Sequence, residues 1–409
     1  MSTVGIVAEY DPFHLGHLYQ MQQAKKRTGA DTVVVVLGGD FLQRGMPSMT
    51  HKRVRARMAA DNGADLVLAL PYVFSVNSAR EYAEGAVRIL SGIGCVDYIS
   101  FGCENEDLSL LNRAAAVMTK EKELSPMIKE KLASGFSYPE AMTQATASLG
   151  GEEISELLRQ PNNLLGCEYL RSIIELDSPL RPVPVRRIGT VSVKETGDQT
   201  DAPILSASRI RLLMETQGIE AAESFVPIQT LENLMYYHED RLRGIMKKMD
   251  SYILKLLRYR LFTADRRELD SIYSVTEGFE NRLTAAISDP GVRSVSSLVE
   301  SAGTRRYTRA RIMRMLTHIL MNFKTEDFEW LRGASCARVL ASSEKGRRLL
   351  ARMRKTAAIP VLSNLSRLNR YDARTRRLME LDIRAAGLYE MLRGGNDFSE
   401  EICYVPYMS

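Results

Sequence analysis

Apolar residues in the first part of the chain recur in short uncharged runs, separated by longer stretches with a helical period. The apolar runs predict strands over residues 4–8, 32–37, 66–70 and 98–101. The intervening stretches predict helices over residues 17–26, 52–62 and 78–93. Short strands joined by helices are typical of right-handed βαβ units on a parallel sheet buried on both faces. We therefore expect an α/β fold with a Rossmann-like parallel sheet, which binds ligands beyond the carboxyl ends of its strands.

The pattern becomes mainly helical further along the chain. Residues 108–158 have a helical period, a new helix is predicted from residue 160, and residues 183–188 predict one more strand. Polar residues at 196–201 predict a loop before the next helix. Beyond residue 220 the period is helical nearly throughout, and strand signals disappear. We predict two domains, residues 1–220 with the parallel sheet and residues 221–409 as an all-helical domain.

Composition places the chain among globular proteins. It has 409 residues, of which 45% are apolar and 26% charged, enough for more than one core. No apolar run approaches the ~20 residues that span a bilayer, and the chain enters a strand with no basic and apolar leader. Five scattered cysteines without CxxC spacing indicate reduced thiols rather than disulfides or zinc. We predict a cytoplasmic protein without membrane association or a stable protein partner.

Positive charge is concentrated in the second half. Residues 221–409 contain 32 Lys and Arg against 23 Asp and Glu, and residues 304–379 contain 19 against 5. Such a run is ordinarily a solvated face, but this density over a long helical stretch favours a surface that follows phosphates. The segment Arg305-Arg-Tyr-Thr-Arg-Ala-Arg311 adds an aromatic residue that could stack on an unpaired base. We predict nucleic-acid contacts at Arg305, Arg306, Arg309, Arg347 and Arg348, and Arg352, Arg354 and Lys355 repeat the same helical spacing.

The tetrapeptide His14-Leu15-Gly16-His17 connects the first predicted strand to its helix. Two histidines three residues apart face the same side of the first helical turn. With Gly16 allowing close backbone approach, they can hold phosphates at the helix N-terminus, where free amides and the dipole favour anions. This arrangement suits cleavage of ATP between its α and β phosphates. A surface pair or a metal-binding pair is the alternative, although no nearby Cys or third His completes a metal site.

A second phosphate-binding signal is Ser206-Ala-Ser208-Arg-Ile-Arg211. Hydroxyls and free amides at a helix start, with an arginine one turn later, can hold the β and γ phosphates and stabilise the departing pyrophosphate. A serine-rich cap on an ordinary surface helix is the alternative. The combination with the two histidines favours the nucleotide site.

Together the two motifs match the nucleotidyltransferase superfamily, which carries HxGH after the first strand and Ser-x-Ser/Thr-x-x-Arg near the end of the catalytic domain. The whole chain further resembles the bacterial tRNA(Met) cytidine acetate ligase family. In the first half, this resemblance rests on Glu9-Tyr-Asp-Pro-Phe-His-Leu-Gly-His17, Gly39-Asp-Phe-Leu-Gln-Arg-Gly-Met-Pro47, Ala69-Leu-Pro-Tyr72, Ser100-Phe-Gly-Cys-Glu104, Pro161-Asn-Asn-Leu-Leu-Gly166 and Arg187-Ile-Gly189. In the second half, it rests on Glu277-Gly-Phe-Glu-Asn-Arg282, Arg306-Tyr-Thr-Arg-Ala-Arg311 and Glu344-Lys-Gly-Arg347.

The resemblance implies an enzyme that converts acetate and ATP to acetyl-adenylate and pyrophosphate. The acetyl group then passes to N4 of the wobble cytidine of elongator tRNA(Met), which would be bound by the basic helical half. His14 and His17 would stabilise charge on the α-phosphate during in-line attack, and Ser206, Ser208 and Arg211 would bind the pyrophosphate end. The implied ATP site further comprises Val7, Ala8, Glu9, Tyr10, Asp11, Pro12, Phe13, Leu15, Gly16, Leu18, Tyr19, Gln20, Gly102, Asn162 and Arg187.

This chemistry requires no acyl nucleophile. Acetate is already ionised at neutral pH, so the enzyme chiefly positions the reactants and neutralises phosphate charge. We expect Mg²⁺ to bridge the phosphates with few or no protein ligands. Three positions depart from the family pattern: Asp11 replaces an asparagine, His51 replaces an aspartate, and residues 190–195 replace a stretch rich in glycine, tyrosine and histidine.

Several other side chains have two interpretations. Asp40, Gln43 and Arg44 follow the second predicted strand, where Gln43 or Arg44 could hold acetate or the target base, or the group could form a loop-stabilising ion pair. The charged positions of the next predicted helix are most simply a solvated face, with tRNA contact as the alternative: Lys52, Arg53, Arg55 and Arg57. Met313, Met315 and Met321 are predicted to fill the core of the second half. Trp330, the one tryptophan of the sequence, is predicted to be a packing anchor.

Two other functions share parts of these signals. A small-molecule adenylyltransferase, acting on a nucleotide or on phosphopantetheine, would carry both phosphate motifs but would need no basic extension. An RNA-binding protein that keeps a nucleotide fold without catalysis would need the basic half only. The co-occurrence of both features favours the tRNA-modifying enzyme.

Overall fold

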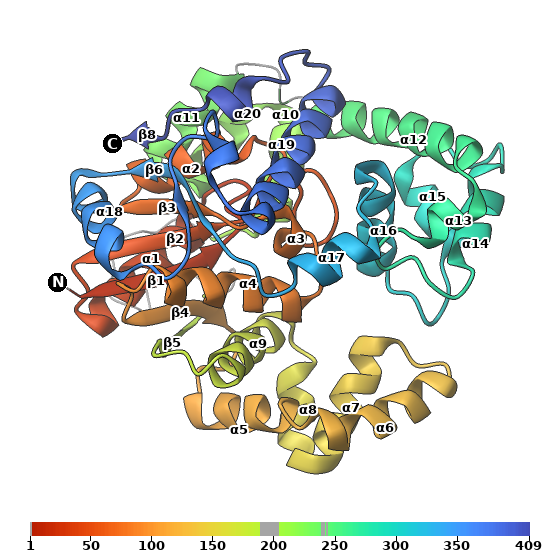
Figure 1. Ribbon diagram of the computed structural model, residues 1–409, viewed down its shortest axis with the longest axis horizontal. Helices are drawn as coiled ribbons and strands as arrows, with labels where there is room; N and C mark the ends of the chain where they lie inside the picture. The colour runs from red at the N-terminus through yellow and green to blue at the C-terminus, as the bar shows by residue number, and fades with distance from the viewer. Residues whose placement is uncertain (1, 189–203, 239–241, 243) are drawn as a thin grey trace.

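A computed structural model describes residues 2–188, 204–238, 242 and 244–409 of the chain. Within them, eight strands form one sheet in the order β5-β4-β1-β2-β3-β6-β7, with β8 beside β6 (Figure 1). The strands are β1 (Thr3–Ala8), β2 (Thr32–Leu37), β3 (Leu66–Ala69), β4 (Tyr98–Cys103), β5 (Arg181–Arg186), β6 (Ala337–Ser342), β7 (Val361–Leu362) and β8 (Tyr407–Met408). The first five strands are parallel to one another, as predicted.

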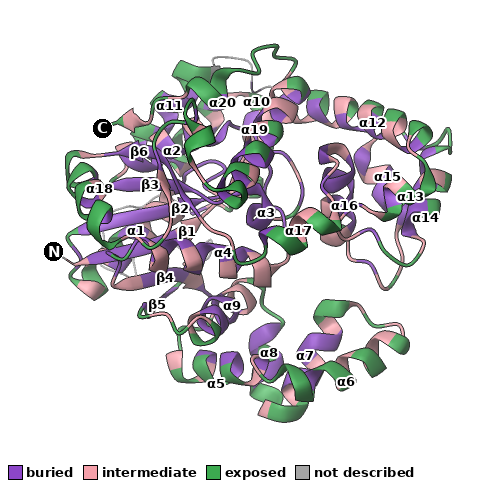
Figure 2. Ribbon diagram, viewed as in Figure 1, coloured by how far each residue is buried: buried purple, intermediate pink, exposed green. Residues whose placement is uncertain are grey.

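The central strands owe their position to their composition. Every residue of β2 is buried, and its run of four valines carries no charge, which suits a parallel strand covered on both faces. Figure 2 shows the strands of the sheet as largely buried ribbon, while the outward faces of the surrounding helices are exposed. The carboxyl ends of β1, β2 and β4 therefore meet at one edge, and the loops that follow them lie together.

The connecting helices confirm the predicted βαβ units. α4 and α9 contact each other and lie on one face of the sheet, and right-handed crossovers place α1 and α2 on the other. These helices are α1 (Leu15–Thr28), α2 (Lys52–Asp61), the short α3 (Tyr72–Ser75), α4 (Ala79–Gly92) and α9 (Pro161–Glu175). A separate group projects beyond β5 at the bottom of Figure 1 and comprises α5 (Leu108–Met118), α6 (Glu121–Ala133), α7 (Tyr138–Gly150) and α8 (Glu152–Leu158).

The C-terminal half is rich in helices, as predicted. Around the sheet and to its right in Figure 1 lie α10 (Ala207–Gln217), α11 (Ile228–His238), α12 (Ile245–Thr263), α13 (Arg266–Asp270), α14 (Phe279–Ile287), α15 (Val295–Ala302), α16 (Arg309–Met321), α17 (Thr325–Leu331), α18 (Glu344–Thr356), α19 (Ala373–Arg393) and α20 (Glu400–Cys403). Among its described residues, this part also contains the 3₁₀ helices η2 (Ile219–Phe225) and η4 (Leu368–Arg370).

The expectation that strands end before residue 220 is wrong. β6 pairs antiparallel with β3, and β7 and β8 pair with β6, so the C-terminal half extends the sheet of the N-terminal half. The apolar run Ala337–Ser342 is short and is interrupted by Arg338, and helical patterns flank it, so the sequence does not predict a strand here. Arg338 is nevertheless buried. The boundary at residue 220 stays a prediction, but the two halves share one sheet.

Several packing predictions can be compared with the structure. Met313, Met315 and Met321 are buried in the core, as predicted. Trp330 is 44% exposed, so its prediction as a packing anchor is wrong. The five cysteines are free thiols, as their spacing predicts. In the part of the chain that the structure describes, no helix has both the length and the apolar character needed to cross a membrane.

Candidate active site

The turn between β1 and α1 is fixed by aromatic packing. Tyr10 adopts a left-handed backbone conformation, with φ of 48°, which non-glycine residues rarely adopt. Its buried ring contacts Phe13 and His17, with centroid separations of 4.7 and 4.8 Å. These contacts hold the turn so that His14 becomes the N-cap of α1.

The two histidines form a reciprocal cap at this helix start. The Gly16 amide donates to Nδ1 of His14 at 3.0 Å, and the His14 amide donates to Nδ1 of His17 at 3.2 Å. Because each Nδ1 accepts a backbone proton, each neutral ring carries its own proton on Nε2. The rings stack with centroids 3.6 Å apart. The site therefore presents two Nε2–H donors side by side.

Both imidazoles are uncharged at neutral pH. Burial, reinforced by Arg187 and Arg211, lowers the pKa of His14 to about 3. Burial also lowers the pKa of His17 well below its usual value, with further contributions from His14 and Arg187. The two rings can therefore donate hydrogen bonds to phosphate oxygens without first losing or gaining a proton.

Gly16 is required by the packing of the cap. A Cβ atom there would lie 2.9 Å from Cε1 of His14 and 3.2 Å from Cγ2 of Ile204. The space beside Gly16, which the sequence predicts for a phosphate group, is thus already occupied by protein atoms. Any larger residue would displace the His14 ring.

Gly102, Asn162 and Arg187 meet beside the histidines, as the resemblance implies. Nη1 of Arg187 donates to Oδ1 of Asn162 at 3.2 Å, and a Cβ on Gly102 would lie 3.3 Å from Cγ of Arg187. Nδ2 of Asn162 donates to the carboxylate of Glu104, which also accepts the Asn163 amide at 2.9 Å. No role is predicted from the sequence for Glu104 or Asn163, although both lie in the motifs Ser100-Phe-Gly-Cys-Glu104 and Pro161-Asn-Asn-Leu-Leu-Gly166.

Arg211 joins the second motif to the first. Its Nη1 donates to the backbone oxygen of Asp11 at 2.6 Å and lies 3.6 Å from Oδ2 of the same residue. Its Nη2 donates to Oγ of Ser208 at 3.1 Å. Ser206 is the N-cap of α10, and both serines are exposed. The start of α10 therefore lies against the turn that carries the histidines.

The comparisons with known proteins agree with this geometry. The HIGH Nucleotidyl Transferase family model matches residues 1–401. Two curated proteins named tRNA(Met) cytidine acetate ligase match nearly end to end. The one from Acetivibrio thermocellus is 34% identical and covers 98% of this chain and 99% of its own, and the one from Bacillus subtilis is 36% identical and covers 96% and 92%. The chain belongs to the tRNA(Met) cytidine acetate ligase family.

Solved structures of TmcAL from Thermotoga maritima share the fold. The form bound with alpha-thio ATP gives a TM-score of 0.88 at 29% identity and covers all of both chains. The apo form gives 0.89 at 29% identity and covers 100% of this chain and 99% of its own. The tRNA(Met) cytidine acetate ligase resemblance and the α/β fold class are confirmed.

Two positions at which this ligase departs from the family pattern have structural roles. Oδ1 of Asp11 accepts the Met49 amide at 3.0 Å, which ties the turn between β1 and α1 to the segment before α2. His51 is the N-cap of α2, and its Nδ1 accepts the Arg53 amide at 3.1 Å. A capping histidine can replace a capping aspartate here because both supply an acceptor. The third departure, residues 190–195, and the predicted loop at 196–201 lie outside the described residues.

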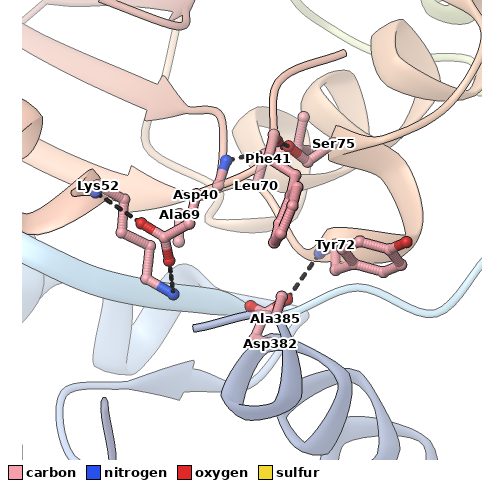
Figure 3. Close-up of a pocket in the computed structure, with 10 residues that line it drawn as sticks. Asp40, Phe41, Lys52, Ala69, Leu70, Tyr72, Ser75, Asp382 and Ala385 are labelled. Carbon is pink, nitrogen blue, oxygen red and sulfur yellow. Dashed lines mark hydrogen bonds and ion pairs between the residues drawn. The ribbon is translucent and has the colours of Figure 1, made fainter. Parts of the chain in front are cut away.

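The prediction that the basic residues of α2 form a solvated face is wrong for Lys52 and Arg55. Both are buried. Nζ of Lys52 lies 3.3 Å from Asp40 and 3.2 Å from Glu401, and the Asp40 carboxylate also accepts the Lys52 amide at 2.7 Å. Figure 3 shows Lys52 pointing toward Asp40, with Asp382 of α19 close to Tyr72. Asp40 therefore stabilises its loop, which favours one of its two interpretations.

A cavity of about 820 Å³ lies along the outer side of α2. Arg53 and Arg57 line it, so these two residues of α2 remain accessible. Its other walls come from the end of α11, the start of α12, the end of α19 and the C-terminal segment, and include Tyr237, Lys248, Arg393, Glu390 and Glu400. His51 also lines this cavity, whereas His14 and His17 do not.

The basic surface residues fall at two separate places. α16 contacts the loop after β2, because Thr317 donates to the backbone oxygen of Gly45, and it thus adjoins the catalytic edge of the sheet. α18 begins beside residues that precede β2 and β3, since Lys345 donates to Asp31 at 3.3 Å and Ser343 to Asp65 at 2.9 Å. The exposed residues Arg347 and Arg348 of α18 therefore lie at the amino edge of the sheet, opposite the histidines.

The predicted stacking of Tyr307 on a base is wrong. The ring is 8% exposed and stacks on Phe279 with centroids 4.5 Å apart. The guanidinium of Arg311 lies over the same ring, 4.3 Å from its centroid. Arg306 pairs with Glu277 at 3.0 Å. This segment stabilises the helical region, and Arg305 and Arg309 are its exposed cations.

Proposed function

We propose that this chain joins acetate to ATP as acetyl-adenylate and then acetylates N4 of the wobble cytidine of elongator tRNA(Met). The observation that carries the proposal is the pair of Nε2–H donors of His14 and His17, flanked by Arg187 and Arg211. The names of the full-length relatives and the alpha-thio ATP bound to the Thermotoga protein support the same substrates. The reaction uses tRNA and ATP, so we propose the cytoplasm as its compartment.

The first step is an in-line displacement at the α-phosphorus of ATP. An acetate oxygen attacks, the new O–P bond forms, and the bond to the β-phosphate oxygen breaks to release pyrophosphate. His14 and His17 donate hydrogen bonds to the α-phosphate oxygens as charge develops there. Arg211, with Ser206 and Ser208, holds the pyrophosphate end. Mg²⁺ carried on the phosphates would neutralise further charge.

The direct test is acetyl transfer to a single tRNA. Purified protein is incubated with ATP, radiolabelled acetate and an elongator tRNA(Met) transcript, and label in acid-precipitated RNA is counted. Label is expected with the natural transcript and not with a control transcript that carries uridine at the wobble position. Absence of label, with adenylylated small molecules formed instead, would support the small-molecule adenylyltransferase.

Charge reversal on the two basic surfaces tests the RNA contacts. Changing Arg305, Arg306 and Arg309 to glutamate is expected to weaken tRNA binding by about tenfold or more and to reduce the salt dependence, because lost phosphate contacts release fewer counterions. Filter binding across a salt series measures both. Charge reversal of Arg347 and Arg348 to glutamate provides the comparison. We expect a smaller loss of tRNA affinity in that variant, because α18 lies at the opposite edge of the sheet. An unchanged salt slope in the first variant would rule out its surface.

A further inference from the structure

Acetyl transfer to a cytidine amine needs a base that the phosphate donors do not supply. The exocyclic amine is a weak nucleophile, and it must lose a proton when it becomes an amide. A positioned base accelerates such a step. This inference rests on the proposed function and concerns the second half of the reaction only.

The other titratable groups of the catalytic turn are already occupied. Nδ1 of each histidine accepts a backbone amide, so Nε2 is a donor and neither ring offers a free lone pair. Asp11 is buried, accepts the Met49 amide and faces Arg211. Asp40 is buried against Lys52. Glu104 accepts hydrogen bonds from Asn162 and Asn163. Glu9 differs from these groups, because one of its carboxylate oxygens accepts no hydrogen bond from a described residue.

Glu9 follows β1 directly and is partly exposed. Its Oε1 accepts the Gln43 amide at 2.7 Å, whereas no hydrogen bond from a described residue reaches Oε2. A Cβ placed on Gly38 would lie 3.5 Å from Cγ of Glu9. One carboxylate oxygen is thus anchored to the loop after β2, and the other is available to a ligand.

Glu9 lies on the opposite side of the site from Gly102, Asn162 and Arg187. Gly102, Asn162 and Arg187 belong to β4, α9 and the segment after β5, which lie on one side of β1. Gly38 and Gln43 follow β2, on the other side of β1. A tRNA cytidine that approaches the acetyl-adenylate from the β2 side would therefore meet Glu9 next to the α-phosphate site.

We propose that Glu9 is the general base that takes the proton from the attacking amine of the tRNA. The amine nitrogen forms a bond to the carbonyl carbon of acetyl-adenylate, and the bond from that carbon to the phosphate oxygen breaks. AMP leaves with the electron pair of that bond. The proton of the nitrogen passes to Oε2 of Glu9 and then to solvent. No further reactant is required.

The surroundings of Glu9 suit this role. Burial raises its pKa, although the Gln43 amide and the charges of Arg55 and Arg211 act in the opposite direction, and Asp11 raises it further. The phenols of Tyr82 and Tyr169 also lie within electrostatic reach. A raised pKa makes the carboxylate a stronger base than a solvated one.

The test separates the two half-reactions in a Glu9→Gln variant. Glutamine keeps the shape and can accept the Gln43 amide, but it cannot take a proton. Because Glu9 also belongs to the implied ATP site, acetate-dependent ATP–pyrophosphate exchange is measured beside transfer for each variant. We expect single-turnover transfer from enzyme-bound acetyl-adenylate to tRNA to fall about 10²–10⁴-fold in Glu9→Gln, a much larger factor than any loss of exchange. A second variant, Glu9→Asp, keeps the carboxylate but withdraws it, and we expect a smaller loss of transfer.

Each outcome decides between specific possibilities. Equal losses of exchange and transfer in both variants would overturn the proposal, because Glu9 would then serve the ATP site or the fold. Transfer within threefold of wild type in Glu9→Gln would also overturn it. Failure of wild-type protein to show acetate-dependent exchange or tRNA acetylation would instead refute the proposed function, whatever the variants do.

Discussion

Replacing His14 or His17 with alanine is expected to abolish acetate-dependent ATP–pyrophosphate exchange while tRNA binding stays intact. Each substitution removes one of the two Nε2–H donors that the caps fix in place. Loss of one preorganised donor to developing charge costs about 10²–10³ in rate, and the stacked partner ring also loses its support. Exchange of labelled pyrophosphate into ATP measures the first half-reaction, and filter binding measures the RNA affinity.

Two controls distinguish chemistry from helix capping. His14→Asn keeps a side-chain acceptor for the Gly16 amide but has no Nε2–H, so we expect the same loss of exchange. His51→Ala removes a capping histidine from α2 in the same way, and we expect exchange to persist. Wild-type exchange in both His14→Ala and His17→Ala would remove the catalytic role. Equal losses in His51→Ala would assign the effect to the fold.

The sheet and the nucleotide motifs could be predicted because local sequence determines them. The valine run of β2 is uncharged and β-branched, so a buried strand is the structure that suits it best. The histidine tetrapeptide follows β1 within a few residues, so its position at the start of α1 could also be predicted. Arg211 lies 200 positions from Asp11, yet their motifs could be paired because both occur in the family that the chain resembles. The structure brings these predicted groups to one edge.

The environment of three side chains could not be predicted, because contacts made in the folded structure determine it. From the sequence, Lys52 resembles a surface lysine of a helix. The helical pattern does not reveal Glu401, the distant residue with which Lys52 forms an ion pair. β6 could not be predicted for a similar reason. Its charged residue Arg338 is buried next to Glu401 and Tyr404, which lie in the distant C-terminal segment. Tyr307 looks available for a base until Phe279 and Arg311 cover its ring. Tertiary contacts decided all three.

Arg55→Met is expected to cause the largest loss of stability. The side chain is fully buried and donates to three backbone oxygens, those of Glu9, Gly39 and Thr50, the last at 3.0 Å. Methionine fills similar space but donates nothing, which leaves buried carbonyls without partners. Each unsatisfied group costs about 1–3 kcal/mol, so we expect about 3–5 kcal/mol less free energy of unfolding. Urea unfolding followed by circular dichroism measures it.

The same substitution at an exposed arginine provides the control. Arg348 is exposed and, among the described residues, pairs with Glu344 one turn earlier at 2.6 Å. We therefore expect Arg348→Met to change stability by less than about 0.5 kcal/mol. Arg55 also connects the loops after β1 and β2, so we expect the Arg55→Met variant, where it remains folded, to bind ATP more weakly. A midpoint shift no larger than that of Arg348→Met would show that the three carbonyls find other donors. Arg55 would then be a tolerated buried charge rather than the support of the catalytic turn.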